Sequence, residues 1–145
     1  MERVLSNTTA LLHELNVTPK SESQIYDAVC GILKLIFPSA SDAPKGKFAK
    51  VFKKYEPDIV VPELSAAIEY KFINSEQDLR SLLGQIADDV QGYTGNPQYK
   101  LFYAVIYLTR DVGLERCELA WSECHFPNHW IPIFVVGPTA SGTIK

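Results

Sequence analysis

Two hydrophobic periods alternate along the chain, and together they predict a fold built from both helices and strands. Apolar residues recur every three or four positions between residues 21 and 37, which is the period of a helix with one buried face. Ser21 and Gln24 have the spacing of a capping box at its start, and Pro38 marks its end. The predicted buried face consists of Ile25, Val29, Ile32 and Ile36.

A second amphipathic helix and several strands are expected further along the chain. Ser75 can cap a helix that runs to residue 93. Residues 99–109 are continuously apolar, which is typical of a strand covered on both faces. Two shorter segments, near residues 57–62 and 66–73, predict a pair of strands between the helices. The second helix is predicted to bury Leu79, Leu82, Leu83, Ile86 and Val90.

The remaining segments give weaker signals. A narrow leucine stripe predicts a helix over residues 3–15, and a late helix over 113–126 precedes a predicted last strand over 129–137. Residues 47–55 fit the strand and helix periods nearly equally, so their structure stays open. The order of these elements predicts an α/β fold, in which helices flank a central mixed β-sheet.

Composition and charge narrow the class of protein. The 145 residues, 46% of them hydrophobic, fit one globular domain. No apolar run reaches the roughly 18 residues of a membrane span, and Met1 to Leu15 lacks the apolar centre of a signal peptide, so we expect a cytoplasmic protein. Three cysteines, an odd number, favour reduced thiols over a disulfide framework.

Charged residues interrupt the predicted pair of strands, "EPDIVVPELSAAIEYKF", which otherwise has the pattern of a buried hairpin. Strand alternation places Glu69 and Lys71 on one face. A turn centred between Glu63 and Leu64 opposes residues whose numbers sum to 127, so Asp58 is expected across from Glu69. Two carboxylates are therefore predicted to meet on one face of the sheet, with the lysine one diagonal step away.

Opposed carboxylates repel each other unless a cation lies between them. A divalent metal ion such as Mg²⁺ takes oxygen ligands of this kind, and a neighbouring amine can hold or deprotonate an attacking water. The alternative is an ion pair of Lys71 with Glu56 or Glu69 on an exposed sheet face. The pattern favours the metal site, because apolar residues flank both strands.

The two predicted helices present further polar residues at the edges of their apolar faces. At about 100° per residue, Glu22 falls at the edge of the first buried face, whereas Asp27 points to water. On the second helix, Gln85 and Asp89 lie four residues apart beside the apolar stripe. Gln85 could orient a water or contact a phosphate. A first-turn acid favoured by the helix dipole and a solvated helix edge are the alternatives for these residues.

These residues together resemble the PD-(D/E)xK nuclease superfamily. The resemblance rests on Glu22, "PD" at 57–58, "EYK" at 69–71 and Gln85, and it covers residues 21–108 as an αβββαβ core. Within that superfamily the chain is similar to the restriction-endonuclease-like group of DpnII and MboI, through "EPDIVVPE", "AAIEYKF" and "QIADDVQGY". The strand before Pro57 is poorly marked. We expect a helical extension over residues 1–18 and a nuclease-like domain over residues 19–145.

The resemblance implies roles for individual residues. Asp58 and Glu69 would be ligands of Mg²⁺, for which Mn²⁺ can substitute, with help from the Tyr70 backbone carbonyl. Lys71 would position and activate the water that attacks a DNA phosphodiester, and Glu22 would be an outer or second-metal ligand. The implied activity is that of a metal-dependent endodeoxyribonuclease, as in restriction or defence against phage. A catalytically inactive relative that binds nucleic acid or a protein partner is the alternative.

A basic segment lies directly before the predicted hairpin, although the net charge of the chain is −3. Its position allows it to line a groove beside the carboxylates and to hold phosphates; a solubilising face is the alternative. Cutting a duplex with one site per chain implies a homodimer or a partner subunit. The predicted nucleic-acid-binding residues are Lys45, Lys47, Lys50, Lys53 and Lys54.

Overall fold

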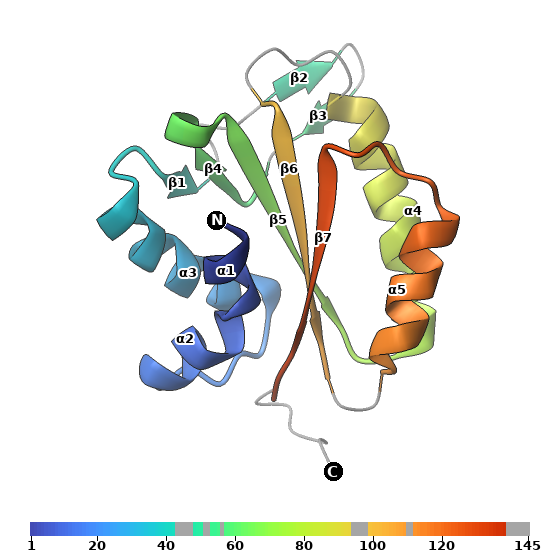
Figure 1. Ribbon diagram of the computed structural model, residues 1–145, viewed down its shortest axis with the longest axis horizontal. Helices are drawn as coiled ribbons and strands as arrows, with labels where there is room; N and C mark the ends of the chain where they lie inside the picture. Colours follow the sequence, from blue (N-terminus) through green and yellow to red (C-terminus); the bar gives the residue numbers. More distant parts are fainter. Residues whose placement is uncertain (43–47, 51–52, 56, 94–98, 110–111, 139–145) are drawn as a thin grey trace.

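A five-stranded mixed sheet with helices on both faces forms the centre of the protein (Figure 1). The computed structural model describes residues 1–42, 48–50, 53–55, 57–93, 99–109 and 112–138. The strand order is β1-β4-β5-β6-β7, and β2 pairs only with β3. The elements are α1 (Glu2–Ser6), α2 (Thr8–Glu14), α3 (Glu22–Ile36), β1 (Ser41–Asp42), β2 (Phe48–Lys50), β3 (Lys53–Tyr55), β4 (Ile59–Val61), β5 (Ala66–Ile73), α4 (Glu76–Tyr93), β6 (Leu101–Leu108), α5 (Leu114–Glu123) and β7 (Trp130–Val136).

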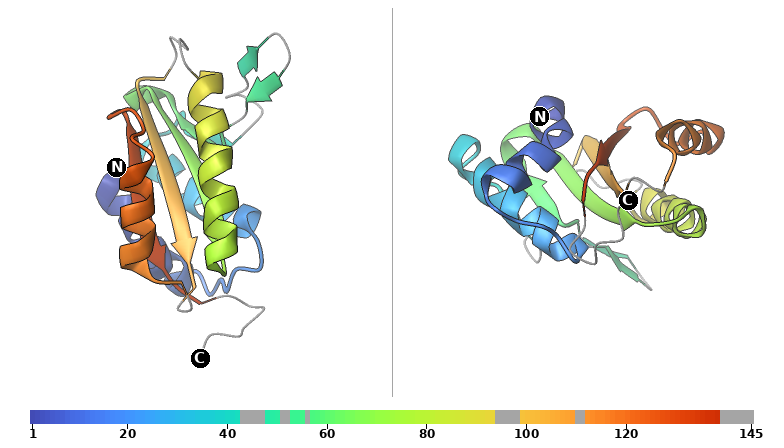
Figure 2. Two further views of the ribbon diagram at one scale, coloured as in Figure 1. Left: turned by 90° about the vertical axis from the view of Figure 1, so that its right-hand side faces the viewer. Right: turned by 90° about the horizontal axis from the view of Figure 1, so that it is seen from below.

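The predicted fold class is confirmed, because α3, β1, β4, β5, α4 and β6 follow one another in the expected αβββαβ order. The sheet is mixed: β4 runs antiparallel to β5, whereas β5, β6 and β7 are parallel. The short strand β1 pairs with β4, and the β2–β3 hairpin is inserted between them in the sequence. This hairpin projects from the body beside α4 (Figure 2).

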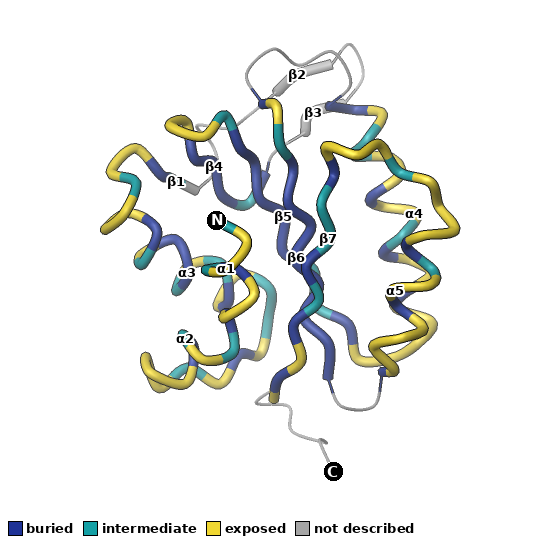
Figure 3. The backbone as a smooth tube through the Cα atoms, viewed as in Figure 1, coloured by how far each residue is buried: buried dark blue, intermediate teal, exposed yellow. Residues whose placement is uncertain are grey.

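Two apolar clusters hold the layers together, one on each face of the sheet. Helices α1, α2 and α3 cover one face, and α4 and α5 cover the other (Figures 1 and 2). Strand β6 is buried along almost its whole length between them, as its unbroken apolar sequence predicts (Figure 3). Alternate residues of β5 face the two clusters, so Ile68 and Tyr70 point to the α3 side and Ala67 and Ile73 to the α4 side.

Two details of the predicted helices differ in the structure. The helix expected over residues 3–15 is interrupted at Asn7, whose side chain donates a hydrogen bond to the Arg3 carbonyl and so competes with helix continuation. The buried face of α3 is shifted from the expected one: Ile36 is 54% exposed, and Leu33 is buried instead. At the start of α3, the Ser21 hydroxyl accepts from the Gln24 N–H, as the capping box predicts.

The N-terminal helices are packed against the sheet, with Leu5 and Leu12 buried among the residues of α3, β5 and β7. The expected domain boundary at residue 18 stays a prediction. In the part of the chain that the structure describes, no helix combines the length and the apolar character needed to cross a membrane.

Candidate active site

Strand β5 extends beyond the end of its neighbour β4, and this difference in length leaves one edge of β5 open. β4 pairs with β5 only over Ile59–Val61, opposite Ile68 to Ala66, which is the predicted register with a sum of 127. The 3₁₀ turn Pro62–Leu64 lies where the turn was expected. β6 pairs with β5 along its full length on the other side. From Glu69 onward, no strand among the described residues pairs with the β4-side edge of β5.

Two carboxylates occupy that edge in place of a strand. The Tyr70 N–H donates to Asp58 Oδ2 at 2.7 Å, and the Phe72 N–H donates to Glu22 Oε1 at 3.2 Å. Alternate backbone groups point the opposite way, since the Ile73 carbonyl accepts from the β6 side. Backbone donors in a partly buried position need acceptors, so the unpaired edge of β5 selects acidic side chains that can reach it.

Each acid comes from a different element. Asp58 directly precedes β4, and Glu22 occupies the first turn of α3 after its Ser21 cap. Although the buried face of α3 is shifted, Glu22 still lies at this edge of β5, whereas Asp27 is exposed and lines neither of the two pockets found there. Glu69 comes from β5 itself and is only 7% exposed.

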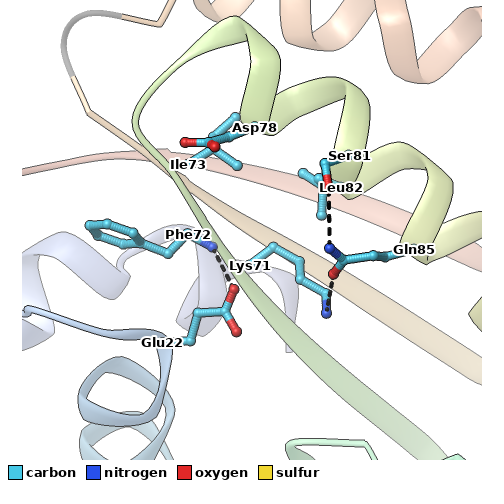
Figure 4. A pocket seen from close by; sticks show the side chains of 8 residues that line it. All are labelled: Glu22, Lys71, Phe72, Ile73, Asp78, Ser81, Leu82 and Gln85. Atoms are coloured by element: carbon cyan, nitrogen blue, oxygen red, sulfur yellow. Dashed lines mark hydrogen bonds between the residues drawn. The ribbon is translucent and has the colours of Figure 1, made fainter.

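Lys71 lies on the α4 side of the same edge. Its Nζ donates to Gln85 Oε1 at 3.4 Å, and Gln85 Nε2 donates to Ser81 Oγ at 3.4 Å (Figure 4). Figure 4 shows the Lys71 and Gln85 side chains meeting beside Glu22. The polar residues of α4 that line the pocket beside Lys71 follow one another at intervals of three and four positions, so they lie on one side of the helix; they are Asp78, Ser81 and Gln85. The pocket has a volume of about 110 Å³ and is lined by Glu22, Lys71, Phe72, Ile73, Asp78, Ser81, Leu82 and Gln85.

A second pocket adjoins the first and shares Glu22 and Phe72 with it. Its volume is about 480 Å³, and Asp58 is among its lining residues. Asp58 and Glu22 thus bond to the strand on either side of Lys71, at Tyr70 and at Phe72. The second pocket is lined by Ser21, Glu22, Ser23, Tyr26, Asp58 and Phe72.

The carboxylates of this edge are held in an environment that opposes their charge. Burial raises the pKa of Asp58 to about 6, although the Tyr70 N–H and the Lys71 charge lower it. Burial also raises the pKa of Glu69 well above its usual range; the charge of Asp58 raises it further, and that of Lys71 lowers it. Asp58 and Glu69 are therefore close enough to repel each other, as the opposed register predicts.

Such a pair of acids has the chemistry of a hard-cation site. The Tyr70 carbonyl lies on the same strand edge as its N–H, beside Asp58, and so adds a neutral oxygen to the two carboxylates. Mg²⁺ is usually bound through one or two carboxylates, with waters and substrate phosphate completing its shell. Within the described ranges, no three His, Cys, Asp or Glu side chains are arranged to hold a metal. Asp58, Glu69 and the Tyr70 carbonyl are the oxygen donors of this edge that could bind a hard cation such as Mg²⁺.

For Asp89, the sequence predicts no more than a place on the solvated edge of a helix. Asp89 raises the pKa of both Asp58 and Glu69 through its charge, so it lies near both. Its spacing of four residues from Gln85 was the signal that could have placed it there.

The structure describes the backbone of only part of the basic segment. Lys45 and Lys47 lie outside the described residues. Lys50 belongs to β2, and Lys53 and Lys54 belong to β3. These two strands form an antiparallel β-hairpin, so the strand alternative for this segment is the observed one.

One comparison with known proteins found a match. A family model described as REase_DpnII-MboI matches residues 5–118, a range that includes every proposed residue of the β5 edge. Searches of curated proteins and of solved structures gave no match.

Proposed function

The chain belongs to the DpnII–MboI restriction endonuclease family, and on that premise we propose that it is a Mg²⁺-dependent endodeoxyribonuclease whose active site is the open edge of β5. The observation that carries the proposal is the convergence of Asp58, Glu69 and Lys71 there: one partly buried and one buried carboxylate, both with raised pKa values, beside one lysine. A purely structural edge would gain nothing from burying like charges.

In this proposal, Asp58, Glu69 and the Tyr70 carbonyl hold the metal ion, and Mn²⁺ can replace Mg²⁺. When bound, the ion supplies positive charge against the phosphate oxygens and lowers the pKa of a water. The Tyr70 N–H bond to Asp58 Oδ2 leaves the other carboxylate oxygen for the ion. Burial of both acids disfavours their charged forms in the free protein, so a cation binding there relieves an existing repulsion.

Lys71 orients the water that attacks phosphorus, and the bond from phosphorus to the leaving sugar oxygen breaks. Its ammonium also faces the negative charge that develops on the phosphate, which is the main demand of this reaction. Gln85 accepts a hydrogen bond from Lys71 Nζ and so limits the positions of that group. Glu22, which holds the next backbone N–H of β5, is proposed as an outer or second-metal ligand.

Substrate binding is assigned to the β2–β3 hairpin and the segment around it. The proposed phosphate contacts are Lys45, Lys47, Lys50, Lys53 and Lys54, next to the hairpin that projects beside α4 (Figure 2). Replacing Lys50, Lys53 and Lys54 by glutamine should weaken DNA binding similarly for all sequences and flatten its salt dependence. An unchanged salt slope would return the lysines to a solubilising role.

The test of activity is incubation of supercoiled plasmid with the purified protein, with Mg²⁺, with Mn²⁺ or with a chelator. We expect nicked and linear products only with metal, and linear product only at concentrations at which a homodimer or a partner subunit is present. Lys71→Met, which keeps the length of the side chain, should lower cleavage by roughly 10³-fold while Mn²⁺ binding persists.

The matched control is Lys100→Met, because Lys100 is an exposed lysine at the start of the neighbouring strand and lines neither pocket. Cleavage by Lys71→Met at the rate of Lys100→Met would overturn the proposed role of the lysine. DNA binding without cleavage in any metal would favour an inactive relative of the same fold.

A further inference from the structure

Helix α2 contacts the proposed metal-binding strand from the face opposite the active site. The Tyr70 side chain points away from Glu69 and Lys71 into the cluster beneath α1, α2 and α3, where it is fully buried. Its hydroxyl lies 2.9 Å from the hydroxyl of Thr8, which is also fully buried. These two residues are 62 positions apart in the chain, and their bond joins the first helices to β5.

The direction of this bond follows from a second contact. Thr8 Oγ1 donates its single hydrogen to the Leu5 carbonyl at 2.6 Å. Tyr70 must therefore donate to Thr8, which completes a chain from the Tyr70 hydroxyl through Thr8 to the backbone of α1.

Apolar packing alone would not need this pair. The surrounding cluster consists of aliphatic and aromatic side chains, among them Leu5, Leu12 and Ile25, that a phenylalanine and a valine could also fill. A buried hydroxyl without a partner is destabilising, so the Tyr70 hydroxyl depends on Thr8. Unlike an apolar contact, a hydrogen bond of this kind sets the position of the ring along its own axis.

The backbone of Tyr70 carries two groups of the proposed site. Its N–H holds Asp58, its carbonyl is a proposed metal ligand, and its chain neighbours are Glu69 and Lys71. We propose that Thr8 is a positioning residue of the nuclease: through the Tyr70 hydroxyl it sets where β5 presents these groups to the metal ion. This inference rests on the proposed function. It makes α1 and α2 part of the framework of the active site.

The test compares two threonines of one helix. Thr9 Oγ1 donates to the Val136 carbonyl at 2.8 Å, so it also ties α2 to the sheet, but it reaches β7 and not β5. Thr8→Val and Thr9→Val each remove one hydroxyl at nearly constant volume. Cleavage is measured against Mg²⁺ concentration at a temperature well below the melting point of every variant, together with Mn²⁺ binding by calorimetry.

Thr8→Val should raise the Mg²⁺ concentration for half-maximal cleavage by roughly tenfold, as loss of an outer-shell partner does in metal sites. Thr9→Val should leave that concentration at the wild-type value even where it lowers the melting temperature. Thr8→Ser keeps the hydroxyl and should restore the wild-type concentration. Equal effects of Thr8→Val and Thr9→Val would show general destabilisation and overturn the inference.

Tyr70→Phe covers the case in which Thr8→Val fails to fold. It removes the same bond but leaves no donor without an acceptor, because Thr8 still donates to the Leu5 carbonyl. We expect it to raise the Mg²⁺ midpoint as well, and adding Thr8→Val to it should raise the midpoint little further. A wild-type midpoint in Tyr70→Phe overturns the inference alone. A wild-type protein that neither binds Mn²⁺ nor cuts DNA overturns the proposed function instead.

Discussion

The two halves of β5 differ in what lies along one edge. Over Ala66 to Ile68 the strand has β4 on one side and β6 on the other, and all three residues are buried. Beyond Ile68, β6 continues but β4 does not, and the backbone N–H groups bond to carboxylates. One strand with one continuous register thus builds core in its first half and a polar site in its second. The short length of β4 is what separates them.

The halves also differ in how they affect stability. The first half buries apolar side chains on both faces, which stabilises the fold. The second half buries Glu69 and partly buries Asp58, and both have raised pKa values, which means that their ionised forms destabilise the metal-free protein. We therefore expect substitutions in the open half to change chemistry and metal binding, and substitutions in the closed half to change stability alone.

The largest effect is expected from Asp58→Asn. The amide oxygen can still accept from the Tyr70 N–H, but the charge that attracts the metal is lost. Mn²⁺ binding should fall below detection by calorimetry, and plasmid cleavage should fall by roughly 10³-fold. The matched control is Glu63→Gln, since Glu63 also accepts a backbone N–H, that of Ser39, but lies in the turn outside both pockets. Metal binding retained in Asp58→Asn would contradict the proposed site.

Glu22→Gln should have a smaller effect, because Glu22 is proposed as an outer or second-metal ligand. The amide can keep the hydrogen bond from the Phe72 N–H, so the edge of β5 stays in place. We expect roughly tenfold slower cleavage at fixed Mg²⁺. Asp27→Asn, on the exposed side of the same helix, should cut like the wild type. Equal cleavage rates for the wild type, Glu22→Gln and Asp27→Asn would show that Glu22 only accepts the hydrogen bond from the Phe72 N–H.

The closed half is tested by Ile68→Val. Removing one methylene group from this fully buried side chain should cost about 1 kcal/mol of the free energy of unfolding. The melting temperature should fall by roughly 2–4 °C for a chain of this size. The Mg²⁺ midpoint of cleavage should not change, because Ile68 lies in the half of β5 that is paired on both edges and its backbone bonds to no residue of the proposed site. A shifted midpoint would show that the two halves are coupled and that the comparison fails.

The last expected effect leaves the chain unchanged and is a dependence of metal-free stability on pH. Because the pKa of Asp58 is raised to about 6, the folded protein binds its proton more tightly than the unfolded chain does. Stability should therefore fall as pH rises through 6, by on the order of 1 kcal/mol between pH 5 and pH 7.5, and Glu69 adds to it with the same sign. Melting curves in chelator measure this, and Asp58→Asn should flatten the dependence. A metal-free protein that is more stable at pH 7.5 would contradict the raised pKa values.

Much of this site could be predicted because it depends on short-range rules. Strand alternation and a turn of fixed length set the register that brings Asp58 to Glu69, and the helical period separates Glu22 from Asp27. The register did not reveal how the acids are held. Their bonds to the Tyr70 and Phe72 N–H groups depend on where β4 stops, and apolar patterning does not mark a strand end precisely.

Contacts between distant segments could not be predicted from the sequence. Thr8 and Tyr70 are one threonine and one tyrosine among several, and neither has a pattern that pairs it with the other. The sequence does not decide between helix and strand for the β2–β3 hairpin, because Phe48, Phe52 and Tyr55 fit the periods of both. Only the pairing of the two strands decides between these structures. The buried face of α3 shifted toward Leu33 because the packing of the helix on the sheet overrides the simple period.

The parallel pairing of β5 with β6 also sets a time order during synthesis. A parallel neighbour requires a crossover, so all of α4 is translated between the strand that carries Glu69 and Lys71 and the strand that holds it in the sheet. The residues of the proposed site leave the ribosome before the backbone that fixes their positions. A growing chain therefore contains these residues for some time without an assembled site, and the proposed activity would arise only after β6 has emerged.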